Sequence, residues 1–402
     1  MSDLATIQRL QFTDRKKAEQ LLQHWFAHHM HLATESVTLM PKAVSLNSFN
    51  GFYRSNGEEY FFKTHVEDQG VVEEYYHAEL LSRAGYNIVR PLQVLHEKEQ
   101  QMVIYPVVRW PVMFDLMHAV ETGNANNVST ETLISAEMYE CERLLGIYRA
   151  TLATSTREEH AAAPIHQLFW HRITGGRFRN FYSGKFVSFP TDHRERQGIA
   201  FDELLGCRWV INGITQQKTL GELLERARIV LDPQRASATV IGHGDAHFGN
   251  VFLENDRQYL YFDPAFAGRH SPLLDVIKPL FHNIFATWMY FPYDVASNLH
   301  LTVSIDDANI AVEHDYTLPP VRQAILQTKL EHLLTPLMEE LRAQSALPED
   351  RREMMQLALM CCPLLTINLL DEQRIPPAIS WLGLLLAVQM GNSDIEAWRE
   401  NL

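Results

Sequence analysis

The chain has 402 residues, of which 46% are hydrophobic, and its formal net charge is −14 at pH 7. This length suffices for two or three domains or for one two-lobed protein, and the apolar fraction excludes wholesale disorder. The acidic balance disfavours binding to a phosphate backbone, so we expect no nucleic-acid partner.

The four cysteines form no C-x-x-C pair, and Cys361 and Cys362 sit in an apolar helical pattern. Reduced core thiols and a cytoplasmic location are therefore expected. The first residues show no basic region followed by an apolar run, so no secretory signal is predicted. The longest apolar stretch, residues 379–388, is too short to span a bilayer, so we predict a buried helix there and no membrane partner.

Residues 13–32 carry apolar side chains at helical spacing, which predicts an amphipathic helix. We expect this helix to pack against the strands that follow it. A role in dimerisation is the alternative, so a monomer and a homodimer both stay open.

Strand-like patterns begin at residue 44. Residues 44–53 are predicted to form a hairpin with its turn near Asn50–Gly51, because Asn-Gly is a strong signal for a tight turn. Residues 54–57 form a second predicted turn. The next predicted strand, residues 59–63, ends on Lys63.

A helix is predicted over residues 71–84. The glycine-containing segment 85–91 then predicts a turn, and residues 91–95 and 101–105 predict a pair of strands. The first hundred residues therefore predict a small antiparallel sheet with one helix beside it.

Residues 121–130 have the composition of a loop, and residues 134–152 repeat apolar side chains at the steps of a core helix. The segment 166–196 interleaves aromatic side chains with arginine and lysine, which is unusual in so acidic a chain. It is either a solvated helix and loop whose aromatics face the core, or a substrate-side insertion that meets an anionic or sugar-like group through arginine.

Most of the remaining chain predicts helices, at 220–231, 274–290, 355–370 and 379–390. We expect His282 to be a hydrogen-bonded core histidine. An acidic hairpin is predicted between these helices, with carboxylates at Asp306, Asp307, Glu313 and Asp315. Those carboxylates suit either a cationic substrate or a solvated face.

The most informative stretch is His243-Gly244-Asp245-Ala246-His247-Phe248-Gly249-Asn250. Apolar residues flank it, and a second short strand then runs into Asp263, so the pattern predicts strand, polar loop, strand, turn, strand. Asp245 and Asn250 have the H-x-D-x-x-x-x-N spacing of a kinase catalytic loop. Phosphoryl transfer needs a carboxylate to orient the attacking hydroxyl, and Mg²⁺ held by an amide oxygen and a second carboxylate.

This stretch resembles the HGDxHxxN loop of the aminoglycoside phosphotransferase and choline kinase superfamily. The segment Phe262-Asp263-Pro264-Ala265-Phe266-Ala267-Gly268 resembles the part of these proteins that carries the second metal aspartate. Asp275 stands where many members have a structural aspartate.

The resemblance implies a protein-kinase-like α+β fold with two lobes. Residues 1–108 would form the ATP-binding lobe, a small antiparallel sheet with helices, and residues 109–402 a mostly helical lobe with the catalytic loop. The resemblance implies ATP and Mg²⁺ as cofactors, a small-molecule acceptor, and shaping of the loop by His243 and His247. The implied site residues are Asp245 as catalytic base, Asn250 and Asp263 as metal ligands, Lys63 steadied by Glu74 on the phosphates, and Asn50 and Gly51 in the turn over the phosphates.

Three other interpretations stay open. Asp, Asn and His in a loop can simply cap turns. A strand would point His243, Asp245 and His247 to one side, as in a zinc hydrolase. A nucleotide-binding protein without turnover is the third alternative. Protein kinase activity is disfavoured, because Gly244 stands where a regulated protein kinase has arginine and Asp263 is followed by Pro264.

The prediction from sequence is therefore an ATP-dependent phosphotransferase that acts on a hydroxyl of a sugar, aminoglycoside or amino alcohol. The acidic hairpin favours a cationic acceptor and the arginine-rich segment an anionic one, so the acceptor is left open. The motif does not decide between ATP and GTP, and antibiotic resistance does not follow from it.

Overall fold

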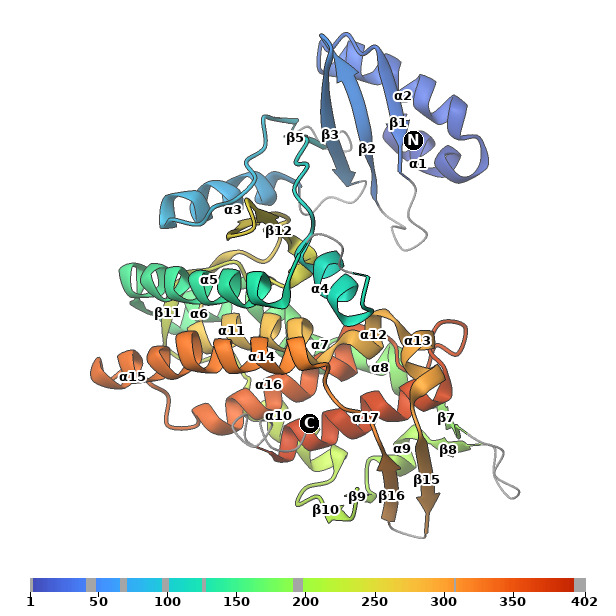
Figure 1. Ribbon diagram of the computed structural model, residues 1–402, viewed down its shortest axis with the longest axis vertical. Helices are drawn as coiled ribbons and strands as arrows, with labels where there is room; N and C mark the ends of the chain where they lie inside the picture. The colour runs from blue at the N-terminus through green and yellow to red at the C-terminus, as the bar shows by residue number, and fades with distance from the viewer. Residues whose placement is uncertain are drawn as a thin grey trace. The chain divides into compact units, whose positions relative to one another are not determined.

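The computed structural model describes residues 3–40, 48–65, 71–95, 101–124, 128–190, 198–306 and 309–393. The chain divides into two compact units. Unit 1 comprises Met1–Pro111 and Leu260–Ala267, and unit 2 comprises Val112–Tyr259 and Gly268–Leu402. Unit 1 contains a small antiparallel sheet and unit 2 is mainly helical (Figure 1), which confirms the predicted α+β class.

The sheet of unit 1 has five strands in the order β1-β2-β3-β5-β4, and every neighbouring pair is antiparallel. The predicted strand pair before the end of this unit is confirmed as β4 and β5. The strands are β1 Ser36–Leu39, β2 Ser48–Ser55, β3 Glu58–His65, β4 Gln93–Leu95 and β5 Met102–Pro106.

Two helices, not one, precede this sheet. They are α1 (Asp3–Thr13) and α2 (Arg15–His29); α2 confirms the predicted amphipathic helix 13–32, and α1 was not predicted. The helices are separated at Asp14, whose carboxylate accepts a hydrogen bond from the Lys17 amide and so caps α2. The buried face of α2 packs on the sheet, where the Phe26 ring lies 5.4 Å from that of Phe62.

The predicted turn at Asn50–Gly51 is wrong, because β2 runs straight through both residues. A Cβ at Gly51 would lie 2.1 Å from the Thr38 carbonyl oxygen, so this glycine allows the close approach of β1. The turn that joins β2 to β3 is Asn56–Gly57, where both residues have positive φ, 53° and 78°. The second predicted turn is therefore confirmed as a tight hairpin turn.

Helix α3 (Val71–Ala84) follows the sheet's hairpin, as predicted, and Gly85 ends it with a φ of 106°. The chain after Gly85 pairs with Tyr261. The Tyr261 amide donates to the Asn87 carbonyl at 2.8 Å, and the Val89 amide donates to the Tyr261 carbonyl at 2.8 Å. These bonds explain why the short segment 260–267 belongs to unit 1.

Unit 2 is built around long, largely buried helices, of which α16 and α17 are neighbours in space and α5 packs against α14 (Figure 1). The predicted core helices 134–152, 220–231, 355–370 and 379–390 are confirmed as α5, α10, α16 and α17. The helices of eight or more residues are α4 Met113–Glu121, α5 Thr130–Thr151, α10 Leu220–Val230, α11 Pro272–Leu280, α14 Pro320–Lys329, α15 Thr335–Ala343, α16 Arg351–Thr366 and α17 Pro377–Asn392.

Shorter elements connect these helices. The predicted helix 274–290 is interrupted: α11 gives way to a π-helical turn, Phe281–Phe285, before α12 begins. The short helices are α6 Arg157–Ala161, α7 Trp170–Thr174, α8 Gly176–Tyr182, α9 Phe201–Leu204, α12 Thr287–Tyr290 and α13 Pro292–Asn298.

The strands of unit 2 form small sheets. The predicted acidic hairpin is confirmed as β15 and β16, and β16 also pairs in parallel with β9. The strands are β6 Ala153–Ser155, β7 Phe186–Ser188, β8 Gly198–Ala200, β9 Arg208–Ile211, β10 Ile214–Thr215, β11 Ser237–Gly242, β12 Val251–Glu254, β13 Gln258–Tyr261, β14 Gly268–His270, β15 Leu301–Ile305 and β16 Asn309–His314.

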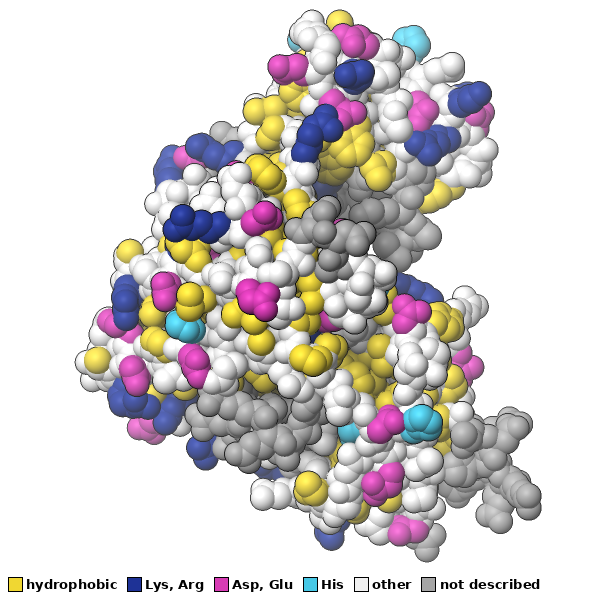
Figure 2. Space-filling view, in the orientation of Figure 1, with side chains coloured by type: hydrophobic (Ala, Val, Ile, Leu, Met, Phe, Trp, Pro, Cys, Tyr) yellow, Lys and Arg dark blue, Asp and Glu magenta, His cyan; other side chains and the backbone are white. Residues whose placement is uncertain are grey.

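All four cysteines are free and buried, as predicted. Among the helices of the described ranges, none is both long enough and apolar enough to cross a membrane. On the face drawn in Figure 2, the described lysines and arginines are scattered and alternate with aspartates and glutamates.

Candidate active site

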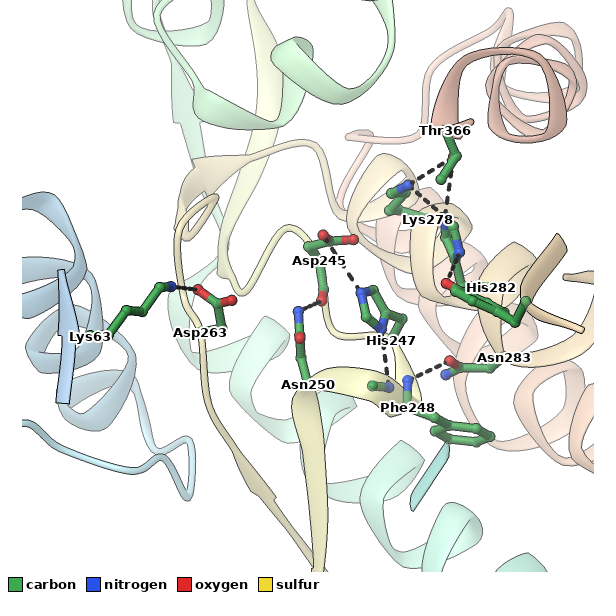
Figure 3. A network of polar contacts seen from close by, with 12 residues as sticks. Lys63, Asp245, His247, Phe248, Asn250, Asp263, Lys278, His282, Asn283 and Thr366 are labelled. Carbon is green, nitrogen blue, oxygen red and sulfur yellow. Dashed lines mark hydrogen bonds and ion pairs between the residues drawn. The ribbon is translucent and has the colours of Figure 1, made fainter. Parts of the chain in front are cut away.

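In unit 1 the structure brings together Lys63 and Asp263, two of the residues predicted from the sequence. Lys63 lies on β3, directly opposite Asn50 on β2 and Val103 on β5. Its Nζ atom lies 3.0 Å from Oδ1 of Asp263 (Figure 3). The carboxylate of Asp263 is 40% exposed, so solvent molecules or a ligand have access to it.

Backbone contacts position Asp263. The residue follows β13 by two positions, and its φ of 55° lies in the left-handed region that aspartate tolerates better than most residues. The Nδ1 atom of His77 on α3 lies 3.0 Å from the carbonyl oxygen of Pro264, the next residue. The side chain of Glu74, also on α3, lies outside the described part of the chain, so its pairing with Lys63 stays a prediction.

In unit 2 the predicted catalytic loop joins β11 to β12. Gly244 has a φ of 80°, and its amide donates to Oδ1 of Asp275 at 2.7 Å. At Gly242 an added Cβ would lie 2.2 Å from Oδ2 of the same carboxylate. The two glycines therefore let the backbone approach Asp275, which lies near the start of α11.

Asp275 is buried and fully engaged, which confirms the structural role implied for it. Tyr148 donates to its Oδ2, and Nε2 of His270 lies 3.0 Å from its Oδ1. Burial alone would raise the pKa of Asp275, but the charge and hydrogen bond of His270, with the bonds from Tyr148 and Gly244, outweigh it and lower that pKa. The negatively charged carboxylate of Asp275 therefore holds the backbone of the loop at Gly244.

Further hydrogen bonds fix the rest of the loop. The Phe248 amide donates to Oδ1 of Asn283 at 2.7 Å, and the Gly249 amide donates to Nδ1 of His247 at 3.0 Å. The side-chain amide of Asn250 donates to the backbone carbonyl of Asp245 at 3.0 Å (Figure 3). The structure thus confirms that His247 shapes the loop, and it joins the two ends of the D-x-x-x-x-N spacing.

The carboxylate of Asp245 stands apart from this network. Its Oδ2 lies 3.9 Å from Nε2 of His247, which is too long for a hydrogen bond. Its Oδ1 is buried and has no hydrogen-bond partner among the described residues. Buried acceptors are nearly always paired, so this oxygen is an exception that calls for an explanation.

Two of the predicted metal ligands, one in each unit, carry oxygen atoms of the kind that a hard cation prefers. Since Nδ2 of Asn250 is occupied by the Asp245 carbonyl, its Oδ1 is the amide atom available for a ligand. Mg²⁺ prefers carboxylate and amide oxygens and is often held by one or two carboxylates. Asn250 and Asp263, which β12 and β13 connect along the chain, supply atoms of this kind.

A buried lysine on α11, which sequence reasoning missed, lies near the catalytic loop. Lys278 on α11 is 3% exposed, and its Nζ lies 2.6 Å from Nε2 of His282 and 3.5 Å from the hydroxyl of Thr366. Tyr290 lies 2.7 Å from the other ring nitrogen of His282, so the prediction of a hydrogen-bonded core histidine is confirmed. The signal in the sequence was the i, i+4 spacing of Lys278 and His282 in the largely apolar stretch 272–285.

With the geometry described, the chain can be compared with known proteins. No family model matches it, and no curated protein matches it. Among solved structures, a thermostable mutant of aminoglycoside phosphotransferase APH(4)-Ia, in ternary complex with AMP-PNP and hygromycin B, aligns with 92% of this chain and 98% of its own. The TM-score is 0.51 and the sequence identity 11%.

The fold is that of an aminoglycoside phosphotransferase. Two other structures align with lower TM-scores. Spectinomycin phosphotransferase APH(9)-Ia, in complex with ADP and spectinomycin, covers 92% of this chain and 98% of its own at a TM-score of 0.42 and 13% identity. Type I macrolide 2′-phosphotransferase covers 82% of this chain and 97% of its own at a TM-score of 0.38 and 13% identity.

The aminoglycoside phosphotransferase fold confirms the predicted kinase-like fold class. Arg269 donates to the Thr151 carbonyl at 2.7 Å, so it positions the strand that precedes α11. The premise of a zinc hydrolase is wrong, because residues 243–247 form a loop and not a strand. No group of three metal-ligating side chains is found among the residues that the structure describes.

Proposed function

We propose that this chain is an ATP-dependent phosphotransferase that moves the γ-phosphate to a hydroxyl group of a small molecule. One observation carries the proposal. Asp245 presents a buried carboxylate oxygen that has no hydrogen-bond partner in the described part of the chain, from a loop whose backbone is fixed by Asp275, Asn283 and Asn250. A substrate hydroxyl is the donor that this oxygen lacks.

In this mechanism Asp245 accepts a hydrogen bond from the acceptor hydroxyl and takes its proton as the oxygen attacks phosphorus. The loop holds the carboxylate still, so little reorganisation is needed when charge develops. His247 stays bound to the Gly249 amide and keeps the loop's shape.

Asn250 and Asp263 would hold Mg²⁺, and Lys63 would contact the phosphates of ATP, steadied by Glu74. Bound Mg²⁺ would neutralise charge on those phosphates. Asn50 pairs with Lys63 across the strands, so both side chains lie on one face of the sheet, and we keep it as a nucleotide contact. Gly51 is kept with it, by the backbone alone. Residues 1–108 would then bind the nucleotide, and residues 109–402 would carry the base and the acceptor site.

The first test is calorimetric titration of the whole chain with ATP, with and without Mg²⁺. Wild type should bind in a Mg²⁺-dependent manner, and Asp263→Ala should weaken that binding at least tenfold. Glu349→Ala, which removes an exposed carboxylate far along the chain from the motif, is the matched control and should bind as wild type does. Absence of MgATP binding by the wild type would overturn the proposal.

The second test separates binding from chemistry. Asp245→Asn should keep MgATP affinity within about threefold and lose about a thousandfold in acceptor-dependent ADP release, since a positioned base contributes roughly 10² to 10⁴ in rate. An unchanged rate would exclude Asp245 as the base, and a simultaneous loss of MgATP binding would point to a structural role.

A further inference from the structure

Three basic side chains from separate helices gather at one place in unit 2. Arg172 on α7 and Arg177 on α8 both donate to the carbonyl oxygen of Leu365, at 3.4 Å and 3.1 Å. Lys278 on α11 reaches the hydroxyl of Thr366, the next residue. The three cations therefore meet at the C-terminal end of α16.

Their protein partners do not balance their charge. The partners are a carbonyl, a hydroxyl and the ring of His282, and none of the three cations forms an ion pair with a carboxylate of the described residues. The end of α16 supplies a partial negative charge of about half a unit. Asp245 favours the charged forms of Arg172 and Lys278, and it is one charge against three.

Burial makes this excess costly. Desolvation lowers the pKa of Lys278, and it lowers the pKa of Arg172 to about 10. Buried charges without a counter-charge are rarely retained in a fold unless they serve a ligand or a reaction.

The three cations differ in exposure, and two of them lie within electrostatic range of Asp245 in the catalytic loop. Arg177 is exposed, Arg172 is half-buried and Lys278 is buried. The ring of His282, bound to Lys278, lies 5.4 Å from the ring of His247 in the loop (Figure 3). An anion bound by Arg172 and Lys278 would therefore lie near Asp245.

We propose that Arg172, Arg177 and Lys278 bind a carboxylate or phosphate group of the acceptor, so that the acceptor is a small hydroxylated anion. Arginine matches such groups with paired N–H donors, and lysine adds a point charge. This inference rests on the proposed function and names the substrate class of the same site.

Two carboxylates of the acidic hairpin, which favoured a cationic acceptor, have partners within the chain, and Asp307 lies outside the described residues. Asp306 accepts hydrogen bonds from the backbone and side chain of Asn309 and so closes the turn of the hairpin. Asp315 pairs with the ring and the amide of His300, with Nδ1 at 2.8 Å. These two carboxylates need no external cation, whereas the three basic side chains form no ion pair within the part of the chain that the structure describes.

The direct test uses inorganic phosphate and acetate as probes in calorimetric titrations of the whole chain. Titrations run with and without MgAMP-PNP, so that the nucleotide site can be filled. At least one probe should bind wild type, and Arg172→Gln and Lys278→Met should each weaken that binding tenfold or more. Tighter binding of phosphate than of acetate indicates a phosphorylated acceptor, and the reverse order indicates a carboxylate.

Arg179→Gln is the matched control, because Arg179 is an exposed arginine on the same short helix as Arg177. It should bind the probes as wild type does, and Arg172→Lys should restore part of the affinity lost in Arg172→Gln. Equal binding by all variants, or no binding of either probe by wild type, would overturn the inference.

A second experiment compares alcohols of one backbone that differ in charge. Glycerate and glycerol 3-phosphate are the anions, glycerol is neutral, and 3-amino-1,2-propanediol is the cation. With MgATP, an anion should give at least tenfold higher kcat/KM than the neutral and cationic analogues, and Arg172→Gln should remove that preference. MgATP binding without any anion preference in either experiment would overturn the inference and leave the proposed function standing; no MgATP binding would remove the proposed function itself.

Discussion

Two lysines on helices of unit 2 are buried among the described residues. One of them contacts a carboxylate, and the other contacts neutral groups. Lys329, at the end of α14, lies 2.5 Å from Oε1 of Glu137 on α5. The other oxygen of Glu137 accepts from Tyr259 at 2.7 Å. Among the described residues, Lys278 has only the neutral side chains of His282 and Thr366 within hydrogen-bond range.

The same burial therefore has opposite results. Desolvation opposes the charge of both lysines, but Glu137 overcomes it and raises the pKa of Lys329, whereas desolvation prevails and lowers the pKa of Lys278. A paired buried charge stabilises the arrangement of helices. An unpaired one reduces stability and is expected where a ligand completes it.

The largest expected effect comes from breaking the paired site. Lys329→Met should lower the free energy of unfolding by about 3–5 kcal/mol, because it leaves the carboxylate of Glu137 buried without a counter-charge. Lys278→Met should change that free energy by less than about 1.5 kcal/mol, since its hydrocarbon volume is kept and no buried partner is left charged. Urea unfolding curves of the three proteins measure both values.

The double variant Lys329→Met with Glu137→Leu is the control for that experiment. It should recover most of the stability lost in Lys329→Met, because no charge stays buried. Equal losses in the two single lysine variants would contradict the contrast between the sites.

A second effect, of intermediate size, concerns the two aspartates of the loop region. Asp275→Asn should lower the free energy of unfolding by about 2–3 kcal/mol, since a charged acceptor of three hydrogen bonds is replaced by a neutral one. Asp245→Asn should leave stability unchanged or raise it, because Oδ1 of Asp245 has no partner to lose among the described residues. Thermal unfolding of both variants at neutral pH gives the comparison, and a larger loss in Asp245→Asn would reverse their assigned roles.

Sequence periodicity predicted most long helices and the sheet of unit 1, since one-sided burial of apolar residues determines both. It placed the turn at Asn50–Gly51 wrongly, because Asn-Gly is a local signal and the close approach of β1 to Gly51 is a tertiary contact. It did not predict that Glu137 is buried. Glu137 follows Leu133 by one helical turn on α5. Its partner Lys329 lies on α14, and the two meet only in the tertiary fold.

In the candidate site, too, local features were predictable from the sequence and tertiary contacts were not. The spacing of Asp245, Asn250 and Asp263 could be read directly, because loop chemistry is local in the chain. The basic residues Arg172 and Lys278 are more than a hundred positions apart, and no periodic pattern links them. The arginine-rich segment is visible in the sequence. Which of its side chains contact the end of α16 depends on the tertiary fold, so the sequence could not predict it.

The smallest expected effect is a difference in pH dependence between the two lysines. The pKa of Lys278 is lower in the folded chain than the usual 10.5, so the unfolded chain binds more protons between those two values and stability rises with pH there. The stability difference between Lys278→Met and wild type should therefore shrink as pH rises toward 10.5, by at most about 1.4 kcal/mol per pH unit.

The pKa of Lys329 is raised, so its contribution is complete below 10.5 and is lost only as pH rises through the higher folded value. The deficit of Lys329→Met should accordingly stay constant up to pH 10.5. The groups that act on Lys278 from neighbouring elements are Asp245, Cys362, Arg172, Arg177 and His282. Urea unfolding at half-unit steps from pH 7 to 10 gives both differences. Parallel slopes for the two variants would show that Lys278 is paired like Lys329, and the argument for an anion at that site would fall.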